Sequence, residues 1–152
     1  MEAVAQGGGR EAIQTVTSVL YDDDPILRSS AVRSLQFLPL HQRYQLLQPL
    51  MEDEVATVRM EVAQSLACVP LDQVSTEQAR QLETLFKWYL GIQALHADMP
   101  ETNLQTGVFY VARGDLPSAE AAYREAISLN WQLVPAYLNL ADLLRSQNRD
   151  EE

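Results

Sequence analysis

Apolar residues recur along this chain every three to four positions, which is the spacing of one face of an α-helix. Proline and aspartate punctuate this pattern: Asp24-Pro25 precedes one helical stretch, and Pro39 and Pro70 follow two others. Proline fits the first turn of a helix and cannot continue one, so these residues mark helix boundaries. The pattern predicts an all-α fold, with helices over residues 10–20, 25–38, 40–51, 55–69, 76–97 and 135–147 and a further pair on either side of Gly114.

The helical pattern repeats, and its period changes near the middle of the chain. In the first half, an offset of 31 residues places Asp22 on Asp53, Arg28 on Arg59, Leu35 on Leu66 and Pro39 on Pro70. In the second half, an offset of 34 residues places Gly107 on Ala141, Tyr110 on Leu144 and Gly114 on Asn148. Such periods are typical of stacked helical hairpins. We therefore predict a right-handed α-solenoid, a fold that offers other molecules a surface to bind.

In the first half, the segments 24–35 and 58–67 resemble the second helix of HEAT repeats. The resemblance implies two hairpins, tied together by an aspartate in each turn and an arginine six residues later. The pairs with this spacing are Asp22 with Arg28 and Asp53 with Arg59. A guanidinium can donate two hydrogen bonds to one carboxylate, which suits a structural ladder between hairpins. The alternative is that these pairs form a catalytic or anion-binding site.

A long helix is predicted at the junction between the two periods. Ser75-Thr-Glu-Gln78 has the pattern of a capping box, and the helix that follows carries a broad apolar arc over 76–97. Tyr89 occupies the place in the 34-residue frame that Tyr123 holds later. We expect this helix to close the first array and to start the second.

The second half resembles tetratricopeptide repeats over 107–129 and again over 134–148. Gly107 and Ala119 are small where two helices would cross, and Gly114 and Asn148 can take the left-handed conformation that ends a helix. The resemblance implies a protein-binding groove along the first helix of each hairpin. Its candidate residues are Leu104, Val108, Val111, Leu138, Asn139, Asp142 and Arg145. The alternative is that these side chains pack against a neighbouring hairpin or another domain.

These patterns divide the chain into four regions. They are a flexible lead over 1–9, which includes Gly7-Gly8-Gly9, HEAT-like repeats over 10–70, a junction over 71–99 and tetratricopeptide repeats over 100–152. The last hairpin is expected to contain only its first helix, so one and a half tetratricopeptide hairpins are present and the chain is expected to be a fragment of a longer protein. That helix is expected to expose Tyr137, Leu140 and Leu144, and a dimer could form through it.

Charge and composition exclude several classes of partner and activity. The chain has 21 acidic and 11 basic residues, a net charge of −10 and a single lysine, Lys87. Nucleic acids and anionic membranes are poor partners for such a surface, and no apolar run is long enough to span a membrane. No signal peptide is visible, and Cys68 is expected to be a buried small apolar residue. We find no nucleophile–base pair, metal cluster or phosphate loop, so no catalytic, metal or cofactor-binding residue is predicted and the chain is not expected to be an enzyme.

The order of these segments resembles one larger family. The run 89–101, followed by the tetratricopeptide repeat and by 134–145, is similar to the C-terminal part of bacterial tetratricopeptide-containing multihaem cytochrome c proteins. That resemblance implies a periplasmic location and an upstream haem domain with doubled C-x-x-C-H motifs. This chain has no C-x-x-C-H motif, so it is expected to hold no haem itself. The predicted function is a non-catalytic scaffold that binds a protein or peptide. The alternative is an accessory domain that packs on the haem domain of its own protein.

Overall fold

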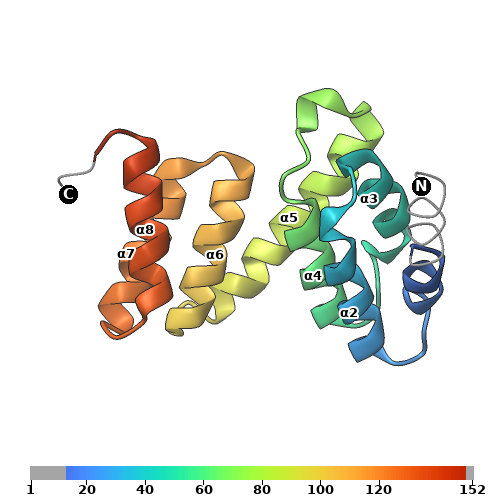
Figure 1. Ribbon diagram of the computed structural model, residues 1–152, viewed down its shortest axis with the longest axis horizontal. Helices are drawn as coiled ribbons and strands as arrows, with labels where there is room; N and C mark the ends of the chain where they lie inside the picture. Colours follow the sequence, from blue (N-terminus) through green and yellow to red (C-terminus); the bar gives the residue numbers. More distant parts are fainter. Residues whose placement is uncertain (1–12, 150–152) are drawn as a thin grey trace, which may run out of the picture. The chain divides into compact units, whose positions relative to one another are not determined.

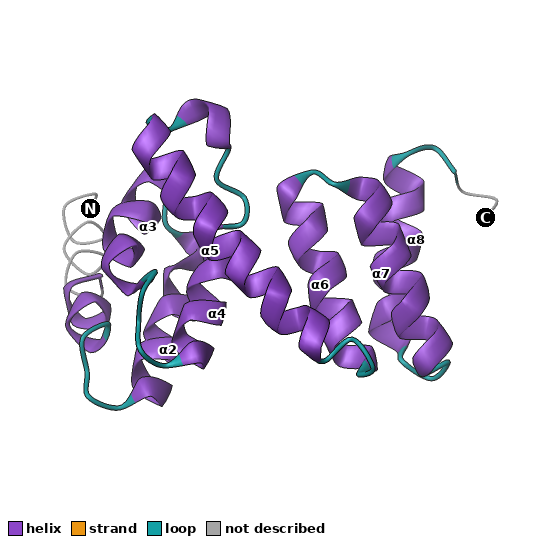
Figure 2. Cartoon of the chain, turned by 180° about the vertical axis from the view of Figure 1, so that it is seen from behind, coloured by secondary structure: helices purple, strands orange, loops and turns teal. Residues whose placement is uncertain are grey.

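The computed structural model of the protein describes residues 13–149, and every regular element in this range is a helix (Figures 1 and 2). The predicted all-α class is therefore confirmed. The chain forms two compact units, one ending at Leu66 and the other beginning at Ala67. The glycine-rich lead predicted over 1–9 lies outside the described residues. The region boundaries drawn from the sequence and the right-handed stacking of the whole chain stay predictions.

The first unit consists of short helices that form two successive hairpins. Its elements are a helix over 13–19, α2 (Pro25–Ser34) with the 3-10 turn Leu35–Phe37, α3 (Leu40–Leu47) with the 3-10 turn Gln48–Leu50, and α4 (Ala56–Leu66). Helix α2 lies alongside α4 (Figure 1). Asp24 caps α2, since its Oδ1 accepts a hydrogen bond of 2.8 Å from the backbone N–H of Ile26. The core of this unit is aliphatic and includes Leu20, Val32, Leu35, Leu47, Val58, Val62 and Leu66.

Helix α4 ends earlier than the sequence predicted. The prediction of a helix over 55–69 placed Cys68 on the buried side, but α4 stops at Leu66 and Cys68 is exposed. The expectation was wrong because Cys68 lies in the turn after the helix, where the 3.6-residue period no longer decides which side chains face inward.

The second unit consists of longer helices. Its elements are the 3-10 turn Leu71–Gln73, α5 (Thr76–Leu95), α6 (Pro100–Arg113), α7 (Leu116–Leu129) and α8 (Val134–Ser146). The predicted capping box begins α5: the N–H of Gln78 donates to Ser75 Oγ at 3.2 Å, and the N–H of Ser75 donates to Gln78 Oε1 at 3.0 Å. Both orphan amides at the start of this helix are thereby satisfied.

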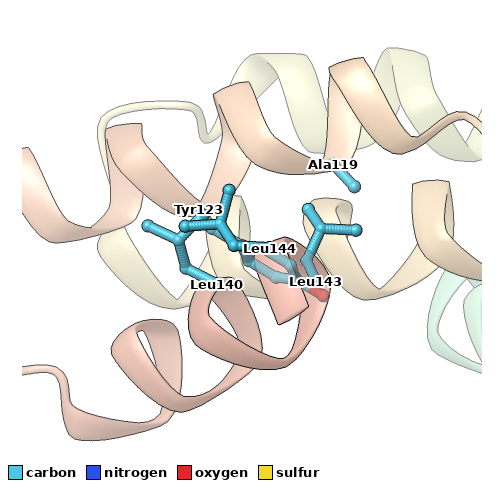
Figure 3. Close-up of a cluster of buried hydrophobic side chains, with 5 residues drawn as sticks. All are labelled: Ala119, Tyr123, Leu140, Leu143 and Leu144. Carbon is cyan, nitrogen blue, oxygen red and sulfur yellow. The ribbon is translucent and has the colours of Figure 1, made fainter. Parts of the chain in front are cut away.

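Helices α6, α7 and α8 lie side by side (Figures 1 and 2). A buried apolar cluster joins α7 to α8 and is shown in Figure 3; it consists of Ala119, Tyr123, Leu140, Leu143 and Leu144. The expectation that Leu140 and Leu144 are exposed was therefore wrong. Helix α8 turns these two residues toward α7, and only Tyr137 of the expected face remains exposed.

The ends of α6 and α8 repeat the same backbone geometry 34 residues apart. Gly114 has a φ of 77° and Asn148 a φ of 57°, so the predicted left-handed caps are confirmed at both positions. After α6, the N–H of Asp115 donates to the carbonyl of Tyr110 at 3.0 Å; after α8, the N–H of Arg149 donates to the carbonyl of Leu144 at 3.0 Å. This is the Schellman pattern, and it relates α8 to α6 as equivalent elements of a repeat.

An arginine and three aromatic rings connect α5, α6 and the start of the second unit. Tyr89 stacks on Phe109 with ring centroids 4.6 Å apart, and Phe86 meets the same ring edge-on at 5.5 Å. The guanidinium of Arg113 lies 4.8 Å from the ring centroid of Phe86. Its Nη1 donates to the carbonyl oxygens of Ala67 at 2.8 Å and Val69 at 2.9 Å.

Replacing Arg113 with alanine is expected to lower the free energy of unfolding by about 2 kcal/mol, because two hydrogen bonds from a charged donor and a cation–π contact are lost. Arg113→Lys keeps the charge and cannot reach both carbonyl oxygens in the same way, so it is expected to recover only part of the loss. Urea unfolding curves of the two variants measure this. Equal stability of Arg113→Ala and the wild type would contradict the assignment.

Candidate functional site

A groove of about 340 Å³ is open on the second unit, between α6 and α8 and above α7. Four apolar or aromatic residues and four polar or aliphatic residues from the three helices line it: Val108, Val111, Leu116 and Tyr123, with Asn139, Asp142, Leu143 and Ser146. The apolar side chains come mainly from α6 and α7, and the polar ones from α8. The groove therefore offers an apolar surface along one side and hydrogen-bonding groups along the other.

Tyr123 shapes this groove because Gly107 leaves room for its ring. A Cβ atom at Gly107 would overlap Cε1 and Cδ1 of the Tyr123 ring. The tyrosine hydroxyl forms a side-chain hydrogen bond with Asn139 on α8. Burial raises the pKa of Tyr123, and the bond with Asn139 offsets part of that effect. One ring thus connects all three helices and forms part of the groove wall.

Four of the seven predicted groove residues line this groove. Val108, Val111, Asn139 and Asp142 are brought together there. The other three lie elsewhere: Leu104 packs against the buried α7–α8 cluster, and Leu138 and Arg145 are not among the lining residues. Arg145 is exposed and donates to Asp142 at 3.0 Å. Whether this groove binds a protein stays a prediction.

The sequence missed four groove residues: Leu116, Tyr123, Leu143 and Ser146. Two of them belong to α7, whereas the resemblance placed the groove only on the first helix of each hairpin. The close approach of Gly107 and Tyr123 was the one signal that could have found α7, because a small residue at a helix crossing lets the opposite helix come close to the surface behind it.

In the first unit, a two-pronged ion pair connects the two hairpins. Arg28 on α2 donates from Nε to Asp53 Oδ2 and from Nη2 to Asp53 Oδ1, both at 2.9 Å. Its Nη1 also donates to the backbone carbonyl oxygens of Asp22 at 2.9 Å and Asp23 at 3.1 Å. The side chains of the pair are 14% and 7% exposed, so little water reaches the contact. One arginine therefore ties the turn before α2 to the turn before α4.

Asp53 serves two structural purposes. Besides binding Arg28, its Oδ1 accepts a hydrogen bond of 2.9 Å from the N–H of Val55. Burial by itself raises the pKa of Asp53, but the hydrogen bonds from Arg28 and Val55 and the charges of Arg28 and Arg59 outweigh it and lower that pKa below its ordinary value. The carboxylate is thus held in its charged form by the contacts that order the turn.

The remaining ladder residues occupy the same two turns. Asp22 Oδ1 accepts a hydrogen bond of 2.9 Å from the N–H of Asp24, and its carbonyl oxygen binds Arg28. Arg59 lies close enough to Asp53 for its charge to affect the pKa of that carboxyl. All four side chains serve turn geometry and hairpin contact. Within residues 13–149, no group of three or more histidine, cysteine or acidic side chains is arranged to hold a metal ion.

Comparison with known proteins agrees with this organisation for the first part of the chain. Residues 1–67 match the family model of HEAT repeats. This part is a HEAT-like repeat region. A search of curated proteins and a search of solved structures return no match. The resemblances of the second half to tetratricopeptide repeats and of the whole to multihaem cytochromes stay predictions, as does the periplasmic location.

Membrane insertion through a helix has no candidate among the described elements. None of the helices within residues 13–149 combines the length and the hydropathy that crossing a bilayer requires.

Proposed function

We propose that this chain is a protein-interaction module whose second unit binds an apolar, helical segment of a partner protein in the groove between α6 and α8. One observation carries the proposal: the groove is open, and Val108, Val111 and Leu116 place apolar surface in it without a core to cover them. An amphipathic helix that lays its apolar face into such a groove removes this surface from water, which is a common mode of peptide recognition.

The size of the groove suits side chains rather than a whole domain. A volume of about 340 Å³ is at the lower end of the range of ligand pockets, enough for a few apolar side chains of a bound segment. Asn139 and Ser146 stand at the polar side, where they could bond to the backbone or polar groups of that segment. The pairing of apolar floor and polar rim is the arrangement that fixes a peptide in one register.

Two further observations support an interaction module. The HEAT-like region belongs to a class of repeats whose extended surfaces bind other proteins. The 34-residue repetition of the helix caps at Gly114 and Asn148 supports a tetratricopeptide-like arrangement of α6 to α8. The net charge of −10 favours partners that are neutral or basic.

A display selection with two matched peptide libraries tests the proposal. One library places leucine at the i, i+3, i+4 and i+7 positions of a helix, and the other has the same composition in scrambled order. We expect peptides of the first library to be enriched on the purified chain. Val108→Asp should weaken the selected peptides by about tenfold, because it places a charge in the apolar wall.

Val134→Asp is the matched control for this experiment. Val134 is also an exposed valine, on α8, and it does not line the groove. Its replacement should leave the affinity of the selected peptides unchanged. Equal enrichment of both libraries, or binding that Val108→Asp does not weaken, would refute the proposed groove.

A further inference from the structure

Helix α8 carries a second apolar surface, away from the groove and from the core. It consists of Val134, Tyr137, Leu138 and Ala141, which we call the outer face of α8. Val134 and Leu138 are each 61% exposed, Tyr137 is 45% exposed, and Ala141 between them is exposed as well. These positions recur at helical spacing, so they form one continuous stripe along the helix.

The repeat in this chain relates that stripe to a surface on α6 that is covered. With the 34-residue offset, Ala141 corresponds to Gly107 and Leu138 to Leu104. On α6 the glycine is buried beneath the ring of Tyr123, and Leu104 packs against the cluster to which Tyr123 belongs. The α6 surface equivalent to the outer face of α8 is thus the one that α7 covers.

From this equivalence we infer that the outer face of α8 binds an amphipathic helix of a partner protein, in the way that α7 binds α6. This surface is distinct from the groove of the proposed function. The groove uses Asn139, Asp142 and Leu143 of α8, which point away from the stripe along Val134, Leu138 and Ala141.

The difference between Gly107 and Ala141 specifies the residue at the centre of the partner helix. A Cβ at Gly107 would overlap the Tyr123 ring, and Ala141 has such a Cβ. A tyrosine therefore cannot sit over Ala141 at the distance that Tyr123 keeps from Gly107. The partner helix carries a small residue, such as alanine, at this crossing point, with larger apolar residues on either side to cover Val134 and Leu138.

Charge specifies the flanks of the partner helix. The chain has a net charge of −10, and the exposed carboxylate of Asp142 borders the outer face. A helix with lysine or arginine beside its apolar stripe is attracted over a long range, whereas an acidic helix is repelled. The partner is therefore a basic amphipathic helix with a small residue at the centre of its apolar stripe.

Two labelled peptides derived from α7 test this inference by fluorescence anisotropy. The adapted peptide has the sequence of residues 115–130 with Tyr123→Ala, Glu120→Lys and Glu125→Lys. The reference peptide carries the two lysine substitutions and keeps the tyrosine. We expect the adapted peptide to bind the full chain saturably and the reference peptide to bind about tenfold more weakly. Both peptides have the same charge, so the difference isolates the fit over Ala141.

Variants of the chain locate the binding surface. Leu138→Asp and Ala141→Arg, both at exposed positions, should weaken the adapted peptide by about tenfold. Val108→Asp lies in the groove and should leave it unchanged, so this inference and the proposed function fail separately. Circular dichroism of each variant checks that the helices remain folded.

Four results would overturn the inference. They are the absence of saturable binding by the adapted peptide, equal binding by the two peptides, binding that Leu138→Asp does not weaken, and self-association of the chain that Leu138→Asp abolishes and the adapted peptide does not displace. The last result would assign the outer face of α8 to a second copy of this chain.

Discussion

Gly107→Ala is expected to lower the free energy of unfolding of the second unit by about 2–3 kcal/mol. The added Cβ would overlap the Tyr123 ring, and overpacking of a filled core typically costs about 1–3 kcal/mol. Alanine is the better helix former by about 1 kcal/mol, but that gain is smaller than the cost of displacing a ring that is buried between three helices. Urea or thermal unfolding measured by circular dichroism gives the difference.

Gly91→Ala is the matched control for this prediction. Gly91 lies inside α5, and a Cβ there would meet no atom within 4 Å. Only the helix propensity changes, so we expect a gain of about 0.5–1 kcal/mol. The two substitutions are chemically identical and should have opposite signs.

A double variant tests whether Tyr123 is the cause. In the background of Tyr123→Leu, which removes most of the ring, Gly107→Ala should cost much less than it does in the wild type. Such a coupling is what residues in direct contact show in a double-mutant cycle. A cost for Gly107→Ala that is unchanged in this background would contradict the explanation.

The second large effect is expected at the ion pair between Arg28 and Asp53. Arg28→Ala leaves the Asp53 carboxylate largely out of water without its cation, and Asp53→Ala does the reverse and also removes the bond to the N–H of Val55. We expect each variant to lower the midpoint of thermal unfolding of the first unit by roughly 5–10 °C. Arg28→Lys should recover little, because an ammonium group cannot reproduce the two-pronged bond.

The pair Glu77–Arg80 on α5 is the control for the ion pair. Both of its side chains are largely exposed, at 59% and 69%, and exposed pairs contribute little to stability. Arg80→Ala should leave the unfolding midpoint unchanged within error. Replacing Arg28 and Asp53 together should cost less than the sum of the two single changes, since neither charge is then left alone.

The pH dependence of this pair has a definite sign. The pKa of Asp53 is lower in the folded chain than in the unfolded chain, where it takes its ordinary value of about 3.9. Its stabilising contribution is therefore complete above that value and is lost as the pH falls through the lower, folded pKa. The difference in stability between the wild type and Asp53→Ala should shrink below about pH 4. A difference that stays constant down to pH 2 would show that the charge of Asp53 does not matter.

Much of the local structure followed from the sequence. The capping box at Ser75, the cap at Asp24 and the left-handed ends at Gly114 and Asn148 were predicted from residue type and spacing, and all are present. These features depend on hydrogen bonds between residues a few positions apart, so a single sequence contains the information that determines them.

The candidate site was predicted only in part. Val108, Val111, Asn139 and Asp142 line the groove as expected, but Leu104 is drawn into the core instead. A helical pattern shows that a side chain is apolar and which stripe it belongs to. It does not show which of several stripes on one helix meets a neighbour, because that depends on where the neighbouring helices lie.

By itself, the sequence determined the helical class, the two repeat periods and the residues that begin and end the helices, because each of these depends on short-range backbone preferences. Only the tertiary structure decided that Arg28 reaches Asp53 in the next hairpin, that Tyr123 forms a wall of the groove, and that Leu140 and Leu144 face the core while Leu138 faces outward. The physical reason is that burial and long-range pairing are properties of packed neighbours, which a local pattern of residues leaves open.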